Sequence, residues 1–392
     1  MNLARMNNMF ALGAPRIFDG QDWHHEAALI ISNGLVVRIT PIANLDKNIE
    51  LERLDDGFIA PGLVDIQVNG GGGVLFNNKP SVTGIRTICQ THIRFGITSL
   101  LTTLITDTPE VRNRAIAAAI AAIEEKIPGF AGLHLEGPHI SLARKGAHDP
   151  ELIRPMNQSD LIALVETKKH LPVLLTTIAA EAVTPEQVSI LSEAGIIVAI
   201  GHCDAPNDKI MPLVAAGATI VTHLFNAMSQ ISAREPGMVG AALSSPKLHA
   251  SLIADGFHVH PALIKIALGA KAGPGRVFLI SDAMLSVGAD IDEFVLNNRR
   301  IKRQNGKLTL DDGTLAGADL DLARAVGYIN GQIGVELGEA LRMASLYPAI
   351  AAQMPPGVGR LGAGLRADLV WFSDQIKAQK TWIGGIEMAA GA

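Results

Sequence analysis

Four side chains that can bind a metal or transfer a proton each follow a short apolar run of the sequence: Glu136, His202, His223 and Asp282. We interpret each run as a buried parallel strand, which puts the four side chains at the carboxyl ends of strands. A closed α/β barrel has its active site at this end. Two neutral imidazoles and one carboxylate bind a divalent cation and leave coordination positions open for water and substrate. The pattern therefore predicts a metal-dependent hydrolase.

The two carboxylates have different expected tasks. Glu136 lies in an apolar segment, where a carboxylate is costly to bury unless it is paired or metal-bound. Asp282 ends the last predicted strand, and a carboxylate there can take a proton from metal-bound water, whose pKa falls from about 15.7 toward about 7, and return it to a leaving nitrogen. We predict Glu136, His202 and His223 as metal ligands and Asp282 as the catalytic base and acid. The alternative is that the histidines and Asp282 only cap loops through hydrogen bonds.

Further polar residues follow the same strand ends and are candidates for substrate binding. They are the segment 145–148, Asn226 with Ala227, Arg234 and His258. The forked donors of Arg234 suit a phosphate or a carboxylate, although a solvated surface arginine is the alternative.

Two neighbouring residues are expected to be structural. His134 alternates with Glu136 along one strand, and we interpret it as a core histidine rather than a ligand. Cys203 follows His202 and points away from the mouth of the barrel if the strand continues, so we interpret it as packing.

The central part of the chain repeats an apolar strand followed by a helical stretch, eight times over roughly 250 residues, which is the usual length of a (β/α)8 barrel. The predicted strands are 62–69, 97–106, 130–137, 172–181, 196–202, 218–226, 250–255 and 276–282. A doubly wound open sheet is the competing fold. The four glycines at 70–73 lack the spacing of a dinucleotide-binding turn, which disfavours it. These glycines predict either a close backbone approach or a flexible turn.

Both ends of the chain have the pattern of short strands, and neither end is large enough for a stable sheet of its own. We therefore predict a small β-sandwich built from residues 1–60 and 356–392, beside a catalytic barrel at 61–355. A β-hairpin at 294–310, with its turn at Gln304-Asn305-Gly306, and a helical run ending near Ala352 follow the eighth strand.

Composition restricts the class of partner. The chain has 392 residues, 48% of them hydrophobic and 18% charged, with a formal net charge of −5. This charge leaves no basic face for nucleic acid or anionic lipid, so a small-molecule substrate is expected. No signal peptide or bilayer-spanning segment is visible in the sequence, and the two cysteines, Cys89 and Cys203, fit a reducing cytoplasm.

Several segments together resemble the N-acetylglucosamine-6-phosphate deacetylases, a branch of the amidohydrolase superfamily. The matching segments are 60–65 with Gln67 and Asn69, 134–138, 145–148, 201–202, 222–228, 234–237, 253–259 and 281–283. They occur in family order over nearly the whole chain. Many superfamily members have a His-x-His pair on the first strand, whereas this chain has Gln67-x-Asn69, as this branch does.

The resemblance implies a (β/α)8 barrel with a β-sandwich, acting as a homodimer on an acetylated amino-sugar phosphate. It implies one divalent metal ion per subunit, zinc or iron, held by Glu136, His202 and His223, with Asp282 as general base and then acid. Ala147 lies in the matched loop beside His148, which would polarise the acetyl carbonyl. The implied contacts to the sugar phosphate are Asn226, Ala227, His258, Arg234 from the same or the neighbouring subunit, and the loop Leu315-Ala316-Gly317.

Two departures from the family pattern concern the substrate and the metal. After Gly317 the family continues with Ser and a Leu-Thr-Met-like run, whereas this chain has Ala318-Asp319-Leu320-Asp321, so sugar contacts or helix packing there are expected to differ. Gln67 and Asn69 in place of histidines argue for one metal ion rather than two.

The alternatives are an N-acetylgalactosamine-6-phosphate deacetylase, a metal hydrolase of cyclic amides or amidines, and a catalytically silent sugar-phosphate binder.

Overall fold

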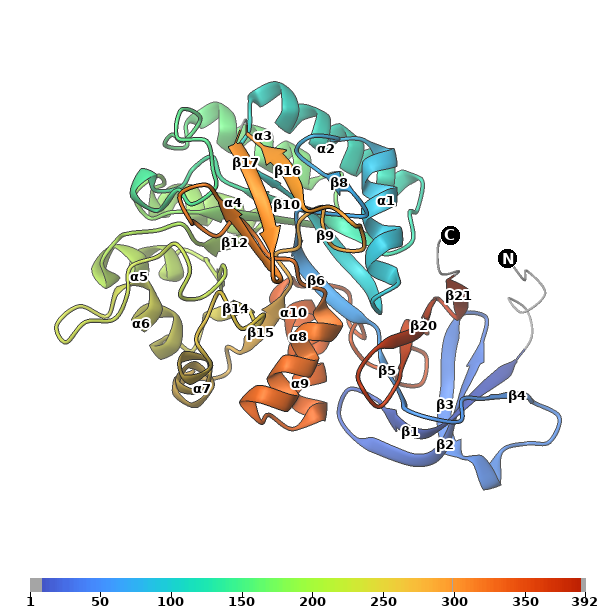
Figure 1. Cartoon of the computed structure of the whole chain (residues 1–392). Helices are drawn as coiled ribbons and strands as arrows, with labels where there is room; N and C mark the ends of the chain where they lie inside the picture. Colours follow the sequence, from blue (N-terminus) through green and yellow to red (C-terminus); the bar gives the residue numbers. More distant parts are fainter. Residues whose placement is uncertain (1–8, 298, 389–392) are drawn as a thin grey trace.

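A computed structural model describes residues 9–297 and 299–388 of the chain. Its centre is the expected (β/α)8 barrel, which is confirmed (Figure 1). Eight parallel strands pair in chain order: β6 (Leu63–Val68), β9 (Ile97–Ile105), β10 (Phe130–Glu136), β11 (Val173–Ile178), β12 (Ile197–Ile200), β13 (Ile220–Val221), β14 (His249–Ile253) and β15 (Val277–Ile280). Three residues beyond β15, Ala283 forms a parallel bridge with Val68 of β6, which closes the barrel.

Helices follow the strands around the barrel. They are α1 (Val82–Ile93), α2 (Pro109–Glu124), α3 (Gln158–Lys168), α4 (Pro185–Glu193), α5 (Asn207–Ala215), α6 (Gly237–Ser244), α7 (Pro261–Ala270), α8 (Leu322–Tyr328), α9 (Leu337–Ala344) and α10 (Leu346–Ala351), with one π-helical turn at Ile329–Ile333. Local sequence fixes several of their starts. Thr184 caps α4 in a capping box with Gln187, and Pro185 occupies the first turn.

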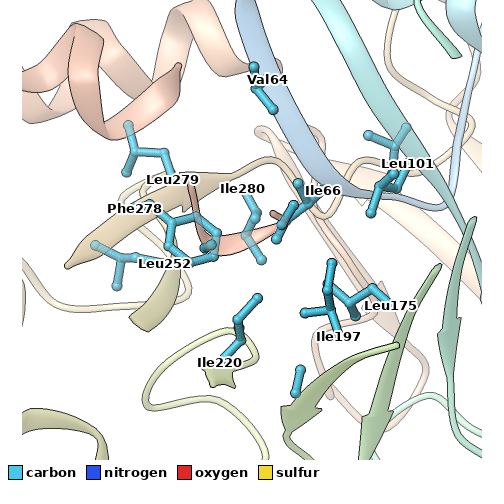
Figure 2. Close-up of a cluster of buried hydrophobic side chains, with 14 of the residues drawn as sticks. Val64, Ile66, Leu101, Leu175, Ile197, Ile220, Leu252, Phe278, Leu279 and Ile280 are labelled. Carbon is cyan, nitrogen blue, oxygen red and sulfur yellow. The ribbon is translucent and has the colours of Figure 1, made fainter. Parts of the chain in front are cut away.

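The barrel core consists of aliphatic and aromatic side chains from nearly all of its strands. Figure 2 shows this cluster, with Val64 and Ile66 from β6 near Leu101 from β9 and Ile280 from β15. These side chains are at most 3% exposed. Burial on both faces explains why the barrel strands are continuous apolar runs rather than alternating ones.

The expected β domain from both chain ends is also confirmed, and it lies beside the barrel (Figure 1). Its strands form one eight-stranded sheet: β1 (Phe10–Phe18), β2 (Trp23–Ser32), β3 (Leu35–Pro41), β4 (Glu50–Arg53), β5 (Phe58–Pro61), β19 (Leu369–Phe372), β20 (Ala378–Ile383) and β21 (Ile386–Met388). The sheet folds back on itself, because Val36 in β3 donates its N–H to the carbonyl of Leu365, 2.8 Å away, just before β19. The enclosed side chains form a second hydrophobic core.

The predicted hairpin after the eighth barrel strand is a three-stranded sheet. It consists of β16 (Glu293–Leu296), β17 (Arg299–Gln304) and β18 (Lys307–Leu310). Its predicted turn is confirmed, with Asn305 and Gly306 at φ of 53° and 78°. Apolar side chains of this sheet pack on Met284 and Leu285, which follow β15. The sheet therefore lies at the carboxyl end of the barrel.

The four consecutive glycines permit a close backbone approach. A Cβ on Gly70 would lie 2.4 Å from the carbonyl oxygen of Val74 and 2.9 Å from the amide nitrogen of Leu285. Gly70–Gly71 (β7) and Val74–Leu75 (β8) form a minimal antiparallel pair. Of the two interpretations of this segment, the close approach is confirmed.

Among the helices that the structure describes, none combines the length and the apolar composition needed to cross a bilayer.

Candidate active site

The four predicted chemical residues lie at the carboxyl end of the barrel, but only Glu136 belongs to a strand. His202, His223 and Asp282 each lie two residues beyond β12, β13 and β15, at φ of 46°, 36° and 50°. This left-handed conformation is unfavourable for residues with a Cβ, and such strain is typical of functional sites. These turns bring all three side chains into the lining of one cavity.

Glu136, His202 and His223 converge on one point. The Nε2 atoms of the two histidines are 3.0 Å apart. Each also approaches Glu136 Oε1, at 3.3 Å from His202 and 3.1 Å from His223. Ligand atoms around a tetrahedral zinc ion, with bonds of about 2.0–2.1 Å, are separated by about 3.3 Å. The three atoms therefore have the spacing of a metal-binding set.

Hydrogen bonds at the outer ring nitrogens fix the tautomers of both histidines. His202 Nδ1 is 2.7 Å from the carbonyl oxygen of Arg144, and His223 Nδ1 is 3.2 Å from that of Asn226. A carbonyl only accepts, so each Nδ1 carries its hydrogen and each Nε2 presents a lone pair to the shared point. Two lone pairs and a carboxylate facing one another require a positive charge between them. The donor set fits a divalent cation.

The electrostatics of the three side chains indicate the same preference. Although burial favours its neutral form, the hydrogen bond and the charge of Glu136 raise the pKa of His223. Burial also opposes ionisation of Glu136, yet the close approach of His202 and His223, which can become protonated, holds the pKa of Glu136 well below its usual value. The cluster thus favours an ionised carboxylate next to a positive charge.

Asp282 lies at the seam of the barrel, facing two amide side chains of β6 and its extension. Asn69 Nδ2 donates to Asp282 Oδ1 at 2.7 Å. Gln67 Nε2 donates to the same oxygen at 3.3 Å and to both oxygens of Glu136, at 3.1 and 3.2 Å. Burial, followed by the charge of Glu136, raises the pKa of Asp282 to about 6. An acid with this pKa can both accept and return a proton near neutral pH.

His148 is a third imidazole, next to Glu136 and His202. Glu136, His148 and His202 offer atoms that all lie within 4.8 Å of one another, so His148 is also a possible ligand by distance. However, His148 Nδ1 accepts from the backbone N–H of Thr106 at 3.4 Å and lies 2.7 Å from the hydroxyl of the same residue, which can also donate to it, so the hydrogen of the neutral ring is on Nε2. His148 therefore presents a donor, whereas His223 presents a lone pair. Burial and the neighbouring His202 hold the pKa of His148 well below its usual value, so the ring is neutral.

These residues border a cavity of about 360 Å³ at the mouth of the barrel. Of the predicted substrate residues, those that line it are Ala147, His148, Asn226, Ala227, His258, Leu315, Ala316 and Gly317. Arg234 is exposed and is not among the lining residues. In this chain alone, the structure does not bring Arg234 to the other candidates.

Neighbouring residues orient or support this site. Asp255 Oδ2 is 2.6 Å from His258 Nδ1, which leaves Nε2 of His258 for the cavity. His134 is bonded by Thr103 and Thr177 on its two ring nitrogens, so its interpretation as a core histidine is confirmed. Cys203 is buried and outside the cavity lining, as expected, with its thiol donating to Glu181.

Sequence reasoning missed several lining residues. Asn77, Arg144, Met284, Leu296 and Thr314 border the cavity, and Arg144 is the one lysine or arginine that does so among the described residues. Asn69 was noted only as part of the family pattern, yet it lines the cavity. Its buried Oδ1 accepts no hydrogen bond from the described part of the chain. For Asn69, its polar side chain before a predicted turn was the only signal in the sequence.

The closed barrel, the terminal β domain and the carboxylate–histidine cluster define a class of metal-dependent hydrolases. A model described as the amidohydrolase family matches residues 58–387, and one described as the NagA composite domain matches residues 9–57. The chain belongs to the amidohydrolase family.

Individual relatives are similar over almost their whole length. An N-acetylgalactosamine-6-phosphate deacetylase of Shewanella sp. (strain ANA-3) is 38% identical, over 96% of this chain and 95% of the relative. An N-acetylglucosamine-6-phosphate deacetylase of Haemophilus influenzae is 31% identical, over 94% and 96%. The crystal structure of the N-acetylglucosamine-6-phosphate deacetylase from Pasteurella multocida matches with a TM-score of 0.93 at 31% identity, over 97% of this chain and all of that one.

Proposed function

We propose that this protein hydrolyses the acetamide of N-acetyl-D-glucosamine 6-phosphate to D-glucosamine 6-phosphate and acetate, in amino-sugar catabolism. The observation that carries the proposal is the convergence of Glu136, His202 and His223 next to Asp282, at the base of one cavity. Full-length relatives named for this deacetylation support the substrate class. A silent binder would be expected to lack one of these four residues.

Glu136, His202 and His223 would hold one divalent cation per chain, zinc or iron. Bound there, the cation would polarise the substrate carbonyl and lower the pKa of water. Gln67 approaches both oxygens of Glu136 with an amide donor, where a histidine would offer a further ligand, which supports a single ion.

Protein side chains carry out the remaining steps of the reaction. Asp282 accepts a proton from the attacking water, and the Nε2–H of His148 donates to the carbonyl oxygen as negative charge develops on it. Asp282 then gives the proton to the nitrogen as the C–N bond breaks, so that acetate and the free amine leave. Asn69 and Gln67 orient Asp282 through their hydrogen bonds.

Substrate recognition is assigned to the lining residues and to Arg234. His258, Asn226 and Ala227 would contact the sugar phosphate, and the loop Leu315-Ala316-Gly317 would contact the sugar. Because Arg234 lies outside the cavity lining, it would act on a substrate only after a loop movement or from the neighbouring subunit of a homodimer.

The proposal also includes the domain boundaries of the chain and the cellular compartment of the protein. Residues 61–355 would carry all of the chemistry, beside a β domain from 1–60 and 356–392. Cys89 and Cys203 are both buried free thiols, which is consistent with a cytoplasmic enzyme.

One experiment tests the proposal directly. The purified protein is analysed for bound metal, and acetate release is measured on acetamido sugars with and without a 6-phosphate. We expect close to one zinc or iron per chain and turnover that depends on the phosphate. Absence of acetate release from every phosphorylated acetamido sugar would reject the function.

N-acetylgalactosamine 6-phosphate is the second candidate substrate. The 38% identity to the Shewanella relative, which is named for that epimer, exceeds the 31% to the Haemophilus one. Values of kcat/KM measured side by side on the two epimers decide between them.

A further inference from the structure

The segment after the lining loop 315–317 contains a buried carboxylate that the proposed chemistry does not use. Asp319 is 5% exposed. Its Oδ1 accepts from the hydroxyl of Ser286 at 2.8 Å, and its Oδ2 accepts from Nε of Arg303 at 2.9 Å. We call these three side chains the Asp319 link. A buried carboxylate with two such partners has one well-defined position.

The link joins β17 to two segments that border the cavity. Ser286 lies four residues after Asp282, Arg303 belongs to β17, and Asp319 follows the lining loop 315–317. Arg303 also donates from Nη1 to the carbonyl of Ala289 at 3.3 Å. The link therefore attaches the β16–β18 sheet to the chain that leaves the last barrel strand.

The backbone next to Asp319 reaches the catalytic residue itself. Ala318 donates its N–H to the carbonyl of Asp282 at 2.9 Å, and Met284 donates to the carbonyl of Ala318 at 3.1 Å. A Cβ on Gly317, which has φ of 65°, would lie 3.1 Å from the same Asp282 carbonyl. A displacement of residue 319 would therefore move both the lining loop and the backbone of Asp282.

The same sheet supplies part of the cavity wall. Leu296 of β16 and the segment 314–317 line it. Apolar packing of the sheet on Met284 and Leu285 is non-directional and does not by itself fix how far the sheet extends over the cavity. The directional contacts of the Asp319 link supply that constraint.

We propose that Asp319 is a positioning residue for the reaction: through Arg303 and Ser286 it fixes the β16–β18 sheet and the loop 315–317 against the cavity, and so aligns bound substrate with Asp282. The proposal rests on the proposed deacetylase function. Asp319 does not contact the reacting atoms and acts through the wall that it holds.

The test compares a variant of the link with a matched variant on the same sheet. Lys302, next to Arg303, forms an exposed ion pair with Asp311 at 2.8 Å, and both side chains face solvent. Asp319→Asn should raise KM and lower kcat/KM for the phosphorylated substrate on the order of tenfold to a hundredfold, because small misplacements of substrate are costly. Asp311→Asn should leave both constants within about twofold, because exposed pairs contribute little.

A double-mutant cycle and hydrogen exchange distinguish positioning from general stability. Arg303→Met should reproduce the kinetic loss, and the double variant should lose no more than either single variant. Amide exchange in β17 should be faster in Asp319→Asn but unchanged in the barrel strands, with the same metal content as wild type.

Two results would overturn the inference: unchanged KM and kcat/KM in Asp319→Asn, or faster exchange throughout the barrel. If the wild-type protein releases no acetate, the proposed function fails, and the exchange comparison between Asp319→Asn and Asp311→Asn still decides whether the link fixes the sheet.

Discussion

Asp282 and His148 line the same cavity, and burial favours the neutral form of both side chains. Burial raises the pKa of Asp282 to about 6, whereas burial holds the pKa of His148 well below its usual value. The carboxylate is thereby a stronger base than an exposed aspartate, while the imidazole stays neutral and keeps its Nε2–H as a donor. In the proposed mechanism, Asp282 therefore handles the proton and His148 the developing oxyanion.

Replacing Asp282 with asparagine tests the proton-transfer role. Asp282→Asn keeps an oxygen for the donors Asn69 and Gln67 but cannot accept a proton. We expect kcat to fall by about a hundredfold to ten-thousandfold, the usual contribution of a general acid–base group. Metal content should be unchanged, since Asp282 is not among the three converging donors. A variant with wild-type turnover would exclude Asp282 as the base.

His148 is tested by removing and then restoring a donor. His148→Ala should lower kcat by about a hundredfold or more while KM changes little, because a donor to the developing oxyanion acts mainly in the transition state. His148→Gln offers an amide N–H in its place and should recover part of the loss. Loss of the bound metal in His148→Ala would show instead that this histidine is a ligand.

At the scale of elements, helices α2 and α3 are joined by one buried carboxylate. Asp160 closes the capping box of α3 and accepts from Nη1 of Arg112 in α2 at 3.1 Å and from Nη2 of Arg154 at 2.7 Å. Burial alone would raise the pKa of Asp160, but Arg154, the backbone N–H of Asn157 and the neighbouring His139 lower it below its usual value. A carboxylate whose pKa is lower in the folded state stabilises that state only while it is ionised.

We therefore predict that the difference in stability between wild type and a variant without the Asp160 charge depends on pH. Asp160→Asn should lower the free energy of unfolding at pH 7 by about 2 kcal/mol, less than for a fully enclosed pair because Arg154 is partly exposed. The difference from wild type should shrink as the pH falls below about 4, where the unfolded carboxyl becomes protonated. Urea denaturation at several pH values measures this difference in the free energy of unfolding. A difference independent of pH would contradict the electrostatic origin.

The order of elements was predictable from the sequence because buried parallel strands are continuous apolar runs. The residues at which the strands end were less predictable. The predicted strand 218–226 is only Ile220–Val221, and His223 lies in a turn beyond it. Hydrophobic patterning indicates which residues are buried, but it carries no information on a left-handed φ that is stabilised by contacts distant in sequence.

Residues that act through their backbone or through a loop were not predictable. Arg144 holds His202 by its carbonyl group, which any residue type could supply. Strand β4 has the polar sequence Glu50–Arg53 and pairs with β1 at the edge of the sheet, where burial does not select apolar residues. By contrast, Glu136 and Asp282 were identifiable, because isolated carboxylates after apolar runs have few structural explanations.

At the scale of the whole molecule, the active site connects parts of the barrel that backbone pairing joins only weakly. β13 has two residues, and among the described residues β6 and the chain after β15 share one bridge, between Val68 and Ala283. Across that seam, buried Asp65 of β6 accepts from the backbone N–H of Ser281 at 3.2 Å, one residue before Asp282. A cation bound by Glu136, His202 and His223 would join β10, β12 and β13 at the same end.

Removal of the metal should therefore lower global stability as well as activity. A ligand that binds only the folded state stabilises it by RT ln(1 + [L]/Kd), about 4 kcal/mol at a thousandfold excess over Kd. The unfolding temperature of wild-type protein should fall by several degrees in chelator and recover with added zinc or iron. His223→Asn removes one converging donor, so its unfolding temperature should respond much less to chelator. Equal responses in the two proteins would mean that the stabilising ion binds elsewhere, and the three strands would then be held by protein contacts alone.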